Sequence, residues 1–191
     1  LLSKKETNPN IIYHYYVYVV EFDGWNHDET NEKLTPLQLA IIKENKQIIQ
    51  ILLNSKKIDI NDIGYQYIVH DKLNKTALHI AVEKNNFDIV KMLLSYEGID
   101  VNTVSIYNYE IEKYKKGFRY YEHKIVEKTA LLVAVENNNL EIINLLLEHK
   151  NTDINKELTF TSYVRTSDPK IDYNKSEKMK IIDVAIQNNN Q

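Results

Sequence analysis

A block of 27 residues occurs three times without a gap, and this fixed period constrains the fold more than any other feature of the sequence. Each copy starts with Thr and ends with Asn, whereas the step from that Asn to the next copy varies from 15 to 27 residues. Regular blocks separated by variable spacers are the signature of a repeat protein, in which each unit stacks on its neighbours. The full copies are 35–61, 76–102 and 129–155, with partial copies at 1–10 and 180–191.

Each block is predicted to form two short helices. In the middle copy, Thr76 is a candidate N-cap, and apolar residues that begin with Leu78 follow at helical spacing. The pair that begins at Asn85 comes next, and Asn tolerates the left-handed backbone that ends a short helix. A second helix carries Leu93 and Leu94 toward the expected core. Neither helix is long enough to be stable alone, so neighbouring copies must bury them.

The blocks share the pattern T-P/A-L-x-x-A, then a helix break, then I-V/I-x-x-L-L and a final I/V-N, and this pattern resembles the ankyrin repeat. The resemblance covers roughly half of the chain. The family repeat is usually about 33 residues long, so these spacers carry extra residues. The family's His of T-P-L-H is kept only as His79, and the resemblance implies that it forms hydrogen bonds within this turn. The family's Gly between the two helices is replaced by Glu44, Asn85, Asn138 and Asn189.

The four spacers are predicted to form β-hairpins. Residues 11–22 are β-branched and aromatic and lead into Asp23–Gly24, a pattern typical of a strand that enters a tight turn. The return, 25–33, is polar and looks like a poor strand. In the third spacer, residues 106–112 alternate, 113–117 form a turn and 118–126 return. The complete spacers are 11–34, 62–75, 103–128 and 156–179.

Together these features predict an α fold. The chain, residues 1–191, is expected to be a single α-solenoid of stacked helix pairs, with the hairpins projecting side by side as fingers. Because both ends of the sequence fall inside a repeat, we expect further repeats on either side.

The composition argues against several functional classes. The net charge of −3 gives no reason to expect nucleic acid or an anionic membrane as a partner. No run approaches the roughly 20 apolar residues of a membrane span, so no membrane insertion is expected. The chain has no cysteine, which excludes disulfides and thiol catalysis and is compatible with a reducing compartment, and a cytoplasmic location is expected.

Motifs of catalysis and metal binding are also missing from the sequence. It has no Gly-rich phosphate loop, no G-x-S-x-G and no H-E-x-x-H. Its six histidines show none of the spacings that bring metal ligands together. We therefore expect a protein that is not an enzyme and that needs no cofactor and no metal.

The third hairpin is the clearest candidate for partner binding, because its far end mixes basic and aromatic side chains. Tyr and Arg are enriched at protein interfaces. Such a tip could bind an acidic or phosphorylated segment, or single-stranded nucleic acid by base stacking. It could also be a solvated tip that Lys protects from edge pairing, with the Tyr side chains only holding the hairpin together. Of the two ligands we favour the acidic protein segment. The candidates are Tyr107, Tyr109, Tyr114, Lys115, Lys116, Phe118, Arg119 and Tyr120.

The resemblance implies a second part of the binding surface. Ankyrin arrays bind partners on a concave side that is made of hairpin tips and first helices. Carried over block by block, the exposed positions of the first helices are Ile42, Lys43, Glu83, Lys84, Glu136 and Asn137.

The predicted function is therefore a non-catalytic module that binds another protein. Two alternatives stay open at this point. The segment could be a structural spacer in a long array, with fingers that pair only with each other. It could also be the regulatory part of a larger enzyme or membrane protein.

Overall fold

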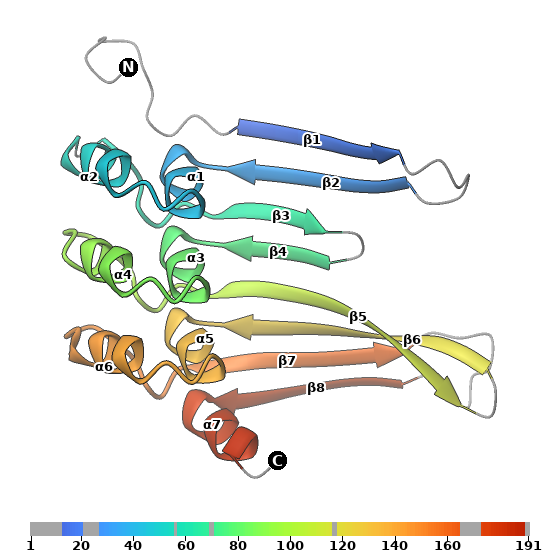
Figure 1. Cartoon of the computed structure of the whole chain (residues 1–191). Coiled ribbons are helices and arrows are strands. Elements are labelled where there is room, and N and C mark those ends of the chain that lie inside the picture. The colour runs from blue at the N-terminus through green and yellow to red at the C-terminus, as the bar shows by residue number, and fades with distance from the viewer. Residues whose placement is uncertain are drawn as a thin grey trace.

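Three helix pairs and a single last helix form the helical part of the computed structural model, which describes residues 13–20, 27–55, 57–68, 71–115, 118–164 and 173–189 (Figure 1). The first helices of the pairs lie in one column beside the strands, and the second helices lie in an outer column. The prediction of two helices in each block is confirmed. The helices are α1 (Pro36–Ile42), α2 (Lys46–Asn54), α3 (Ala77–Glu83), α4 (Phe87–Leu94), α5 (Ala130–Glu136), α6 (Leu140–Glu148) and α7 (Ile181–Asn189).

The spacers form one continuous antiparallel sheet of eight strands, which follow each other in chain order. Each spacer folds into a hairpin, and the return strand of one hairpin also pairs with the outgoing strand of the next. The strands are β1 (Tyr13–Val20), β2 (His27–Leu34), β3 (Gly64–Ile68), β4 (Asp71–Lys75), β5 (Ser105–Lys115), β6 (Phe118–Lys128), β7 (Glu157–Val164) and β8 (Tyr173–Lys180).

Classing the chain as an α fold, an α-solenoid with separate fingers, was therefore wrong. An isolated hairpin leaves unpaired N–H and C=O groups along both of its edges. Stacking of the helix pairs brings neighbouring hairpins side by side, and these edges then pair. The hairpins of the last two spacers, for example, are joined from Glu122 opposite Val164 to Val126 opposite Phe160. The molecule is a mixed repeat of helix pairs and strand pairs.

Two hairpins also differ from their predicted strands. The polar return of the first spacer is predicted to be a poor strand, yet β2 pairs with β1 along its whole length. The sequence predicts a turn over 113–117, but β5 and β6 stay paired as far as Lys115 and Phe118. Strand formation depends on the neighbouring strands more than on a residue's own preference. The partial copy at 1–10 and the turn at Asp23–Gly24 lie outside the described residues.

Short polar side chains begin the helices of each pair. Each of these N-cap residues accepts a hydrogen bond from the backbone N–H three residues further on. A cap of this kind contributes about 1 kcal/mol to the stability of a helix. The N-caps are Thr35, Thr76 and Thr129 in the first helices and Asn45, Asn86 and Asn139 in the second.

The connection between the two helices of a pair contains one residue with a left-handed backbone. Glu44, Asn85 and Asn138 occupy this position with φ values of 54°, 53° and 52°. Asn adopts this conformation at low cost because its short side chain bonds locally, whereas most residues with a Cβ are strained there. The prediction that Asn ends the first helix is confirmed for Asn85 and Asn138. In the first block Glu44 occupies this position, and its backbone is strained there.

Replacing Glu44 with Asn is expected to raise the free energy of unfolding by about 0.5–1 kcal/mol, because the left-handed strain is relieved. The change also removes an exposed ion pair from Lys84 Nζ to Glu44 Oε1 (3.3 Å), which contributes about 0.2–1 kcal/mol and so offsets part of the relieved strain. Urea unfolding would measure the gain. The reverse change, Asn85→Glu, is the control and should destabilise. A loss of stability in both variants would contradict the strain argument.

The apolar core lies between the stacked helices. Leu93 is fully buried, and its counterpart Leu146 is 1% exposed. The next residue in each copy is more variable, since Leu53 is buried but Leu147 is 47% exposed. The expectation that both leucines of each second helix are buried therefore holds only in part.

The Asn that ends each of the first two blocks links neighbouring repeats through its side-chain amide. Asn61 Nδ2 donates to Gly98 O (2.8 Å), and Asn61 Oδ1 accepts from the backbone N of Asp100 (2.8 Å). Asn102 makes the same two bonds, 2.6 and 2.8 Å long, with the following block. This explains why the blocks keep a constant length, because a shift of one residue would break both bonds.

Candidate partner-binding surface

One face of the sheet is turned toward the first helices, and we call it the helix-facing face. Residues that are paired across antiparallel strands lie on the same face. Tyr107 pairs with Val126, and Tyr109 with Lys124. Tyr107 Oη donates to Glu83 Oε1 of α3 (2.5 Å), which identifies this face as the one next to the helices.

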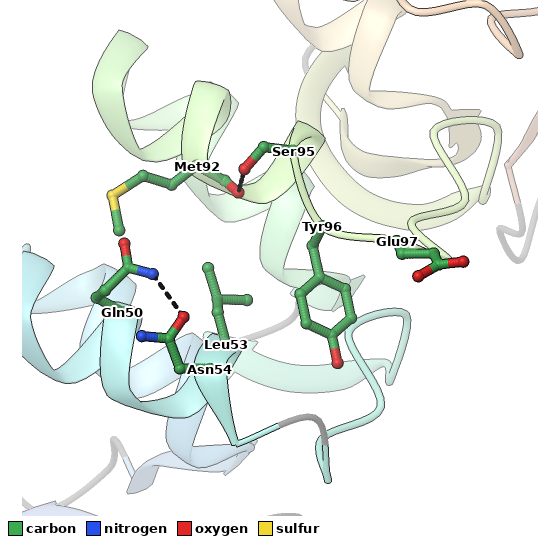
Figure 2. Close-up of a pocket in the computed structure, with 7 residues that line it drawn as sticks. All are labelled: Gln50, Leu53, Asn54, Met92, Ser95, Tyr96 and Glu97. Carbon is green, nitrogen blue, oxygen red and sulfur yellow. Dashed lines mark hydrogen bonds between the residues drawn. The ribbon is translucent and has the colours of Figure 1, made fainter.

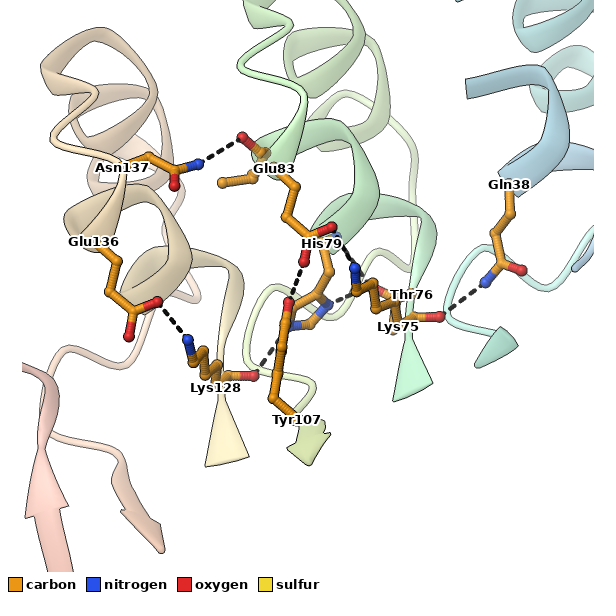
Figure 3. A network of polar contacts seen from close by, with 10 residues as sticks. Gln38, Lys75, Thr76, His79, Glu83, Tyr107, Lys128, Glu136 and Asn137 are labelled. Atoms are coloured by element: carbon orange, nitrogen blue, oxygen red, sulfur yellow. Dashed lines mark hydrogen bonds and ion pairs between the residues drawn. The ribbon is translucent and has the colours of Figure 1, made fainter. Parts of the chain in front are cut away.

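A polar network joins the base of this face to the first helices (Figure 3). Lys75 Nζ lies 2.6 Å from Glu83 Oε2, and Lys128 Nζ lies 2.6 Å from Glu136 Oε2. The Lys128 ammonium also sits 4.7 Å from the ring centroid of Tyr107, a cation–π geometry. Each of these lysines is the last residue of a return strand, and each glutamate is the last residue of a first helix. The pairs therefore fix the sheet to the helices.

Burial strengthens this network. Tyr107 is 5% exposed, and its burial, together with the neighbouring Glu83 carboxylate, raises the pKa of its hydroxyl. Burial by itself lowers the pKa of Lys128, but the hydrogen bond and charge of Glu136 outweigh it, and the net pKa is raised. Both groups are therefore held in the protonated state, with Tyr107 neutral and Lys128 charged.

The sequence contains a pattern from which the contacts of these two lysines could have been predicted. They stand directly before the cap residues Thr76 and Thr129, and each glutamate stands seven residues after its cap. In the first block these two positions are Leu34 and Ile42, which are both apolar. The two positions thus change together, as residues in contact do. At the last helix they are Met179 and Gln187, and Gln187 Nε2 lies 3.5 Å from the Met179 sulfur.

His79 forms the hydrogen bonds that the resemblance implies, together with one that it does not. Within the turn, its Nδ1 lies 2.7 Å from Thr76 Oγ1. Its Nε2 lies 3.0 Å from Lys128 O in the next repeat, and because a carbonyl can only accept, Nε2 carries the hydrogen. Burial is the main cause that lowers the pKa of His79 to about 4, so the ring is neutral. His79 joins two repeats and is not an exposed binding residue.

Near its far end, the third hairpin forms a side-chain hydrogen bond with the fourth. Lys113 Nζ lies 2.5 Å from Glu122 Oε2, and Tyr173 Oη donates to Glu122 Oε1 (2.6 Å). Burial by itself raises the pKa of Glu122, but the bonds from Lys113 and Tyr173 outweigh it and hold the pKa below its ordinary value. Lys113 thus belongs to a contact within the sheet.

A shallow hollow of about 180 Å³ opens on the helix-facing face across β6, β7 and β8. Val126 and Phe160 form its apolar part, and both are partly buried against the core. Lys124 and Lys175 lie at its margins, and Lys175 is paired with Glu177 (2.5 Å). The hollow therefore combines an aromatic ring with two ammonium groups, one of which is paired with the Glu177 carboxylate that also lines it.

The predicted site residues of the third hairpin are separated by the structure. Tyr107 is buried in the network, and Tyr109 is half-buried with its ring centroid 6.2 Å from that of Tyr107. Tyr114 is 70% exposed and donates to Glu112 Oε1 (2.8 Å), and Tyr120 is half-exposed. A partner can reach the last two, whereas Tyr107 offers almost no surface. The backbones of Lys115, Phe118 and Arg119 are in paired strands, their side chains lie outside the described part, and Lys116 lies outside it altogether.

The predicted residues of the first helices lie near the ends of α1, α3 and α5. Ile42 is partly buried against the core, Lys43 is exposed, and Lys84 is exposed and paired with Glu44. Glu83 and Glu136 are held by the two lysines of the network. Asn137 is exposed and donates to Val82 O (3.4 Å) in the preceding repeat. The structure thus joins Tyr107, Glu83 and Glu136 through Lys75 and Lys128, which the sequence analysis missed.

Among the described residues, no helix is long and apolar enough to cross a membrane. The same part of the chain brings together no group of three or more side chains that could hold a metal ion.

Stacked helix pairs joined by hairpins, with capped first helices and an Asn that links successive blocks, define a repeat protein. The chain belongs to the ankyrin repeat family. A family profile described as "Ankyrin repeats (3 copies)" matches residues 4–105, and one described as "Ankyrin repeat" matches residues 127–156. No curated protein sequence matches the chain significantly. Ankyrin repeats generally mediate protein–protein interactions and are typically non-catalytic.

Proposed function

We propose that this chain is a non-catalytic module that binds a partner protein across the helix-facing face of its sheet. The exposed ends of the first helices and the far end of the third hairpin extend this surface. The partner would present an acidic segment with an apolar side chain. The observation that carries the proposal is the hollow between β6 and β8, which places Phe160 beside Lys124 and Lys175.

The chemistry of the hollow supports this partner. Val126 and Phe160 keep part of their apolar surface in contact with solvent, and covering such a ring is a main source of binding energy at interfaces. Lys124 makes no salt bridge within the described part of the chain, although its charge helps to lower the pKa of Glu122, so a partner carboxylate beside it would gain a charge-assisted contact. Tyr109 lies opposite Lys124 and continues the aromatic surface sideways onto β5.

The third hairpin extends beyond the part of the sheet that carries the hollow. β6 pairs with β7 only from Glu122 to Val126, so the described residues nearer the tip, including Tyr120, are paired with β5 alone. Figure 1 shows the ends of β5 and β6 reaching beyond the neighbouring strands. We propose that the partner contacts both faces of this hairpin end, through Tyr120 on the helix-facing face and Tyr114 on the other, together with Lys115, Lys116, Phe118 and Arg119. At the helix ends, we propose that Lys43 and Lys84 contact it. The cytoplasmic location expected from the sequence stays a prediction.

Photo-crosslinking from opposite faces of one strand would test the proposal. Phe160 and Tyr163 are both aromatic residues of β7, and because they are three residues apart they point to opposite faces. A benzophenone amino acid at position 160, used in a lysate of the native host, is expected to give a defined protein adduct, whereas position 163 gives none. The adduct should decrease in the double variant Lys124→Glu, Lys175→Glu and at higher salt. Equal adducts from both positions would contradict binding on the helix-facing face.

A structural role is the second candidate, because the hairpins pair with one another. β2 pairs with β3, β4 with β5 and β6 with β7, so one function of the strands is to join repeats. On this reading the module is a stiff section of an array and its sheet has no partner. The same crosslinking residue can be placed at position 114, at the far end of the third hairpin. The absence of protein adducts from both position 160 and position 114 would favour this structural role.

A further inference from the structure

A second hollow lies on the other side of the helical part, between the outer helices α2 and α4 and away from the sheet (Figure 2). Its volume is about 600 Å³. Leu53 and Met92 contribute apolar surface, Gln50 and Asn54 contribute amides, and Tyr96 and Glu97 follow the end of α4. Figure 2 shows Leu53 between the Gln50 and Asn54 amides on one side and the Tyr96 ring on the other. We call this hollow the α2/α4 groove.

The electrostatics of the α2/α4 groove favour a cation. Of the described residues that line it, Glu97 is the one with a charge, and it is negative. The C-terminal ends of both helices also lie there, since α2 ends at Asn54 and α4 at Leu94. The last carbonyls of a helix carry a partial negative charge, and two parallel ends reinforce each other. The Tyr96 ring adds a face on which a cation can stack.

The next repeat offers an internal comparison. The residues of the next repeat that correspond to Met92, Tyr96 and Glu97 are Leu145 in α6 and His149 and Lys150 directly after it, and Gln50 corresponds to Lys91. The equivalent surface between α4 and α6 therefore carries Lys where the α2/α4 groove carries Gln and Glu. Both sets of residues occur in the same fold, so the difference in charge is compatible with the same packing.

We propose that the α2/α4 groove binds a Lys or Arg side chain that a basic segment of a partner protein presents. The methylenes of that side chain would cover Leu53 and Met92, and its charged end would lie among Glu97, the Tyr96 ring and the amide oxygens. This site is on the opposite side of the helical layer from the helix-facing face of the sheet, so it does not depend on the function proposed above.

Methionine methyl signals in NMR spectra provide the test. The chain has two methionines, Met92 in the groove and Met179 at the end of β8, so methyl labelling gives one reporter and one internal reference. Titration with the peptide acetyl-Ala-Arg-Ala-amide is expected to move the Met92 signal in a saturable way and to leave Met179 unchanged. The same peptide with citrulline, which keeps the shape of Arg without its charge, should bind at least about tenfold more weakly.

Exchange of residues between the two grooves provides matched variants. The double variant Tyr96→His, Glu97→Lys uses residues that the next repeat already has, and it is expected to fold normally and to lose the Met92 shift. The reciprocal variant Lys91→Gln, Leu145→Met, His149→Tyr, Lys150→Glu should gain a responsive methyl signal at position 145. Equal binding of the Arg and citrulline peptides, an unchanged response in the double variant, or no saturable Met92 shift would each overturn the proposal.

Discussion

Replacing Leu93 with Ala is expected to lower the free energy of unfolding by about 2–5 kcal/mol. Leu93 is fully buried, and the core around it is closed by the neighbouring helix pairs. The truncated side chain loses its apolar burial and leaves a cavity that stacked helices cannot fill without moving apart. The loss of stability is measured from the midpoints of urea unfolding.

Two controls separate core from surface. Leu147 is also a leucine of a second helix, but it is 47% exposed, so Leu147→Ala should cost clearly less. Tyr114 is 70% exposed, and Tyr114→Ala should change stability by no more than about 0.5 kcal/mol. Equal losses from Leu93→Ala and Tyr114→Ala would contradict the assignment of the helix pairs as the core and the hairpin end as surface.

Lowering the pH from 7 to 5 is expected to remove about 2 kcal/mol of stability through His79 alone. Its pKa is about 4 in the folded chain and has its ordinary value of 6.5 in the unfolded chain. Between pH 6.5 and pH 4, the unfolded state therefore binds a proton on this ring and the folded state does not. The contribution of the neutral ring to stability is fully present only above pH 6.5. This contribution falls between pH 6.5 and pH 4 and is constant below that range.

The variant His79→Gln is the matched control for this effect. Gln38 occupies the same position in the first block, where its Nε2 donates to Lys75 O (2.9 Å) as His79 Nε2 does to Lys128 O. Gln at position 79 should therefore keep the link between repeats and fold at pH 7. Urea midpoints measured at pH 7 and pH 5 should differ much less in the variant than in the natural chain. The same difference in both proteins would assign the pH dependence to other groups.

The helices and their boundaries could be predicted from sequence because their causes are local. Thr76 caps its helix and Asn85 turns the chain through bonds and dihedral angles within a few residues. The sheet could not be predicted in the same way. Whether β4 pairs with β5 depends on how two helix pairs stack, and no residue of either strand encodes this by itself.

In the candidate site, too, features with local causes could be predicted from sequence, and features that depend on contacts between distant residues could not. The exposed Tyr114 follows from its place at the end of a hairpin, and the bond from His79 to Thr76 follows from the turn. The burial of Tyr107 against Glu83 joins two consecutive repeats, and the hollow around Phe160 needs strands from two hairpins. Contacts of this kind appear in a sequence only as positions that change together, as the residues before and seven after each cap do.

The pairing of successive hairpins has a consequence for the cooperativity of the array. In repeat proteins, stability is the sum of the intrinsic stability of each unit and the coupling between nearest neighbours. Here each unit is coupled to the next by its helices, by its strands and by the Asn61 and Asn102 amides. The larger the coupling, the longer the stretch that must melt together. The sheet is therefore expected to make the row of weak units unfold as one block, because opening one hairpin also breaks the strand pairing of its neighbours.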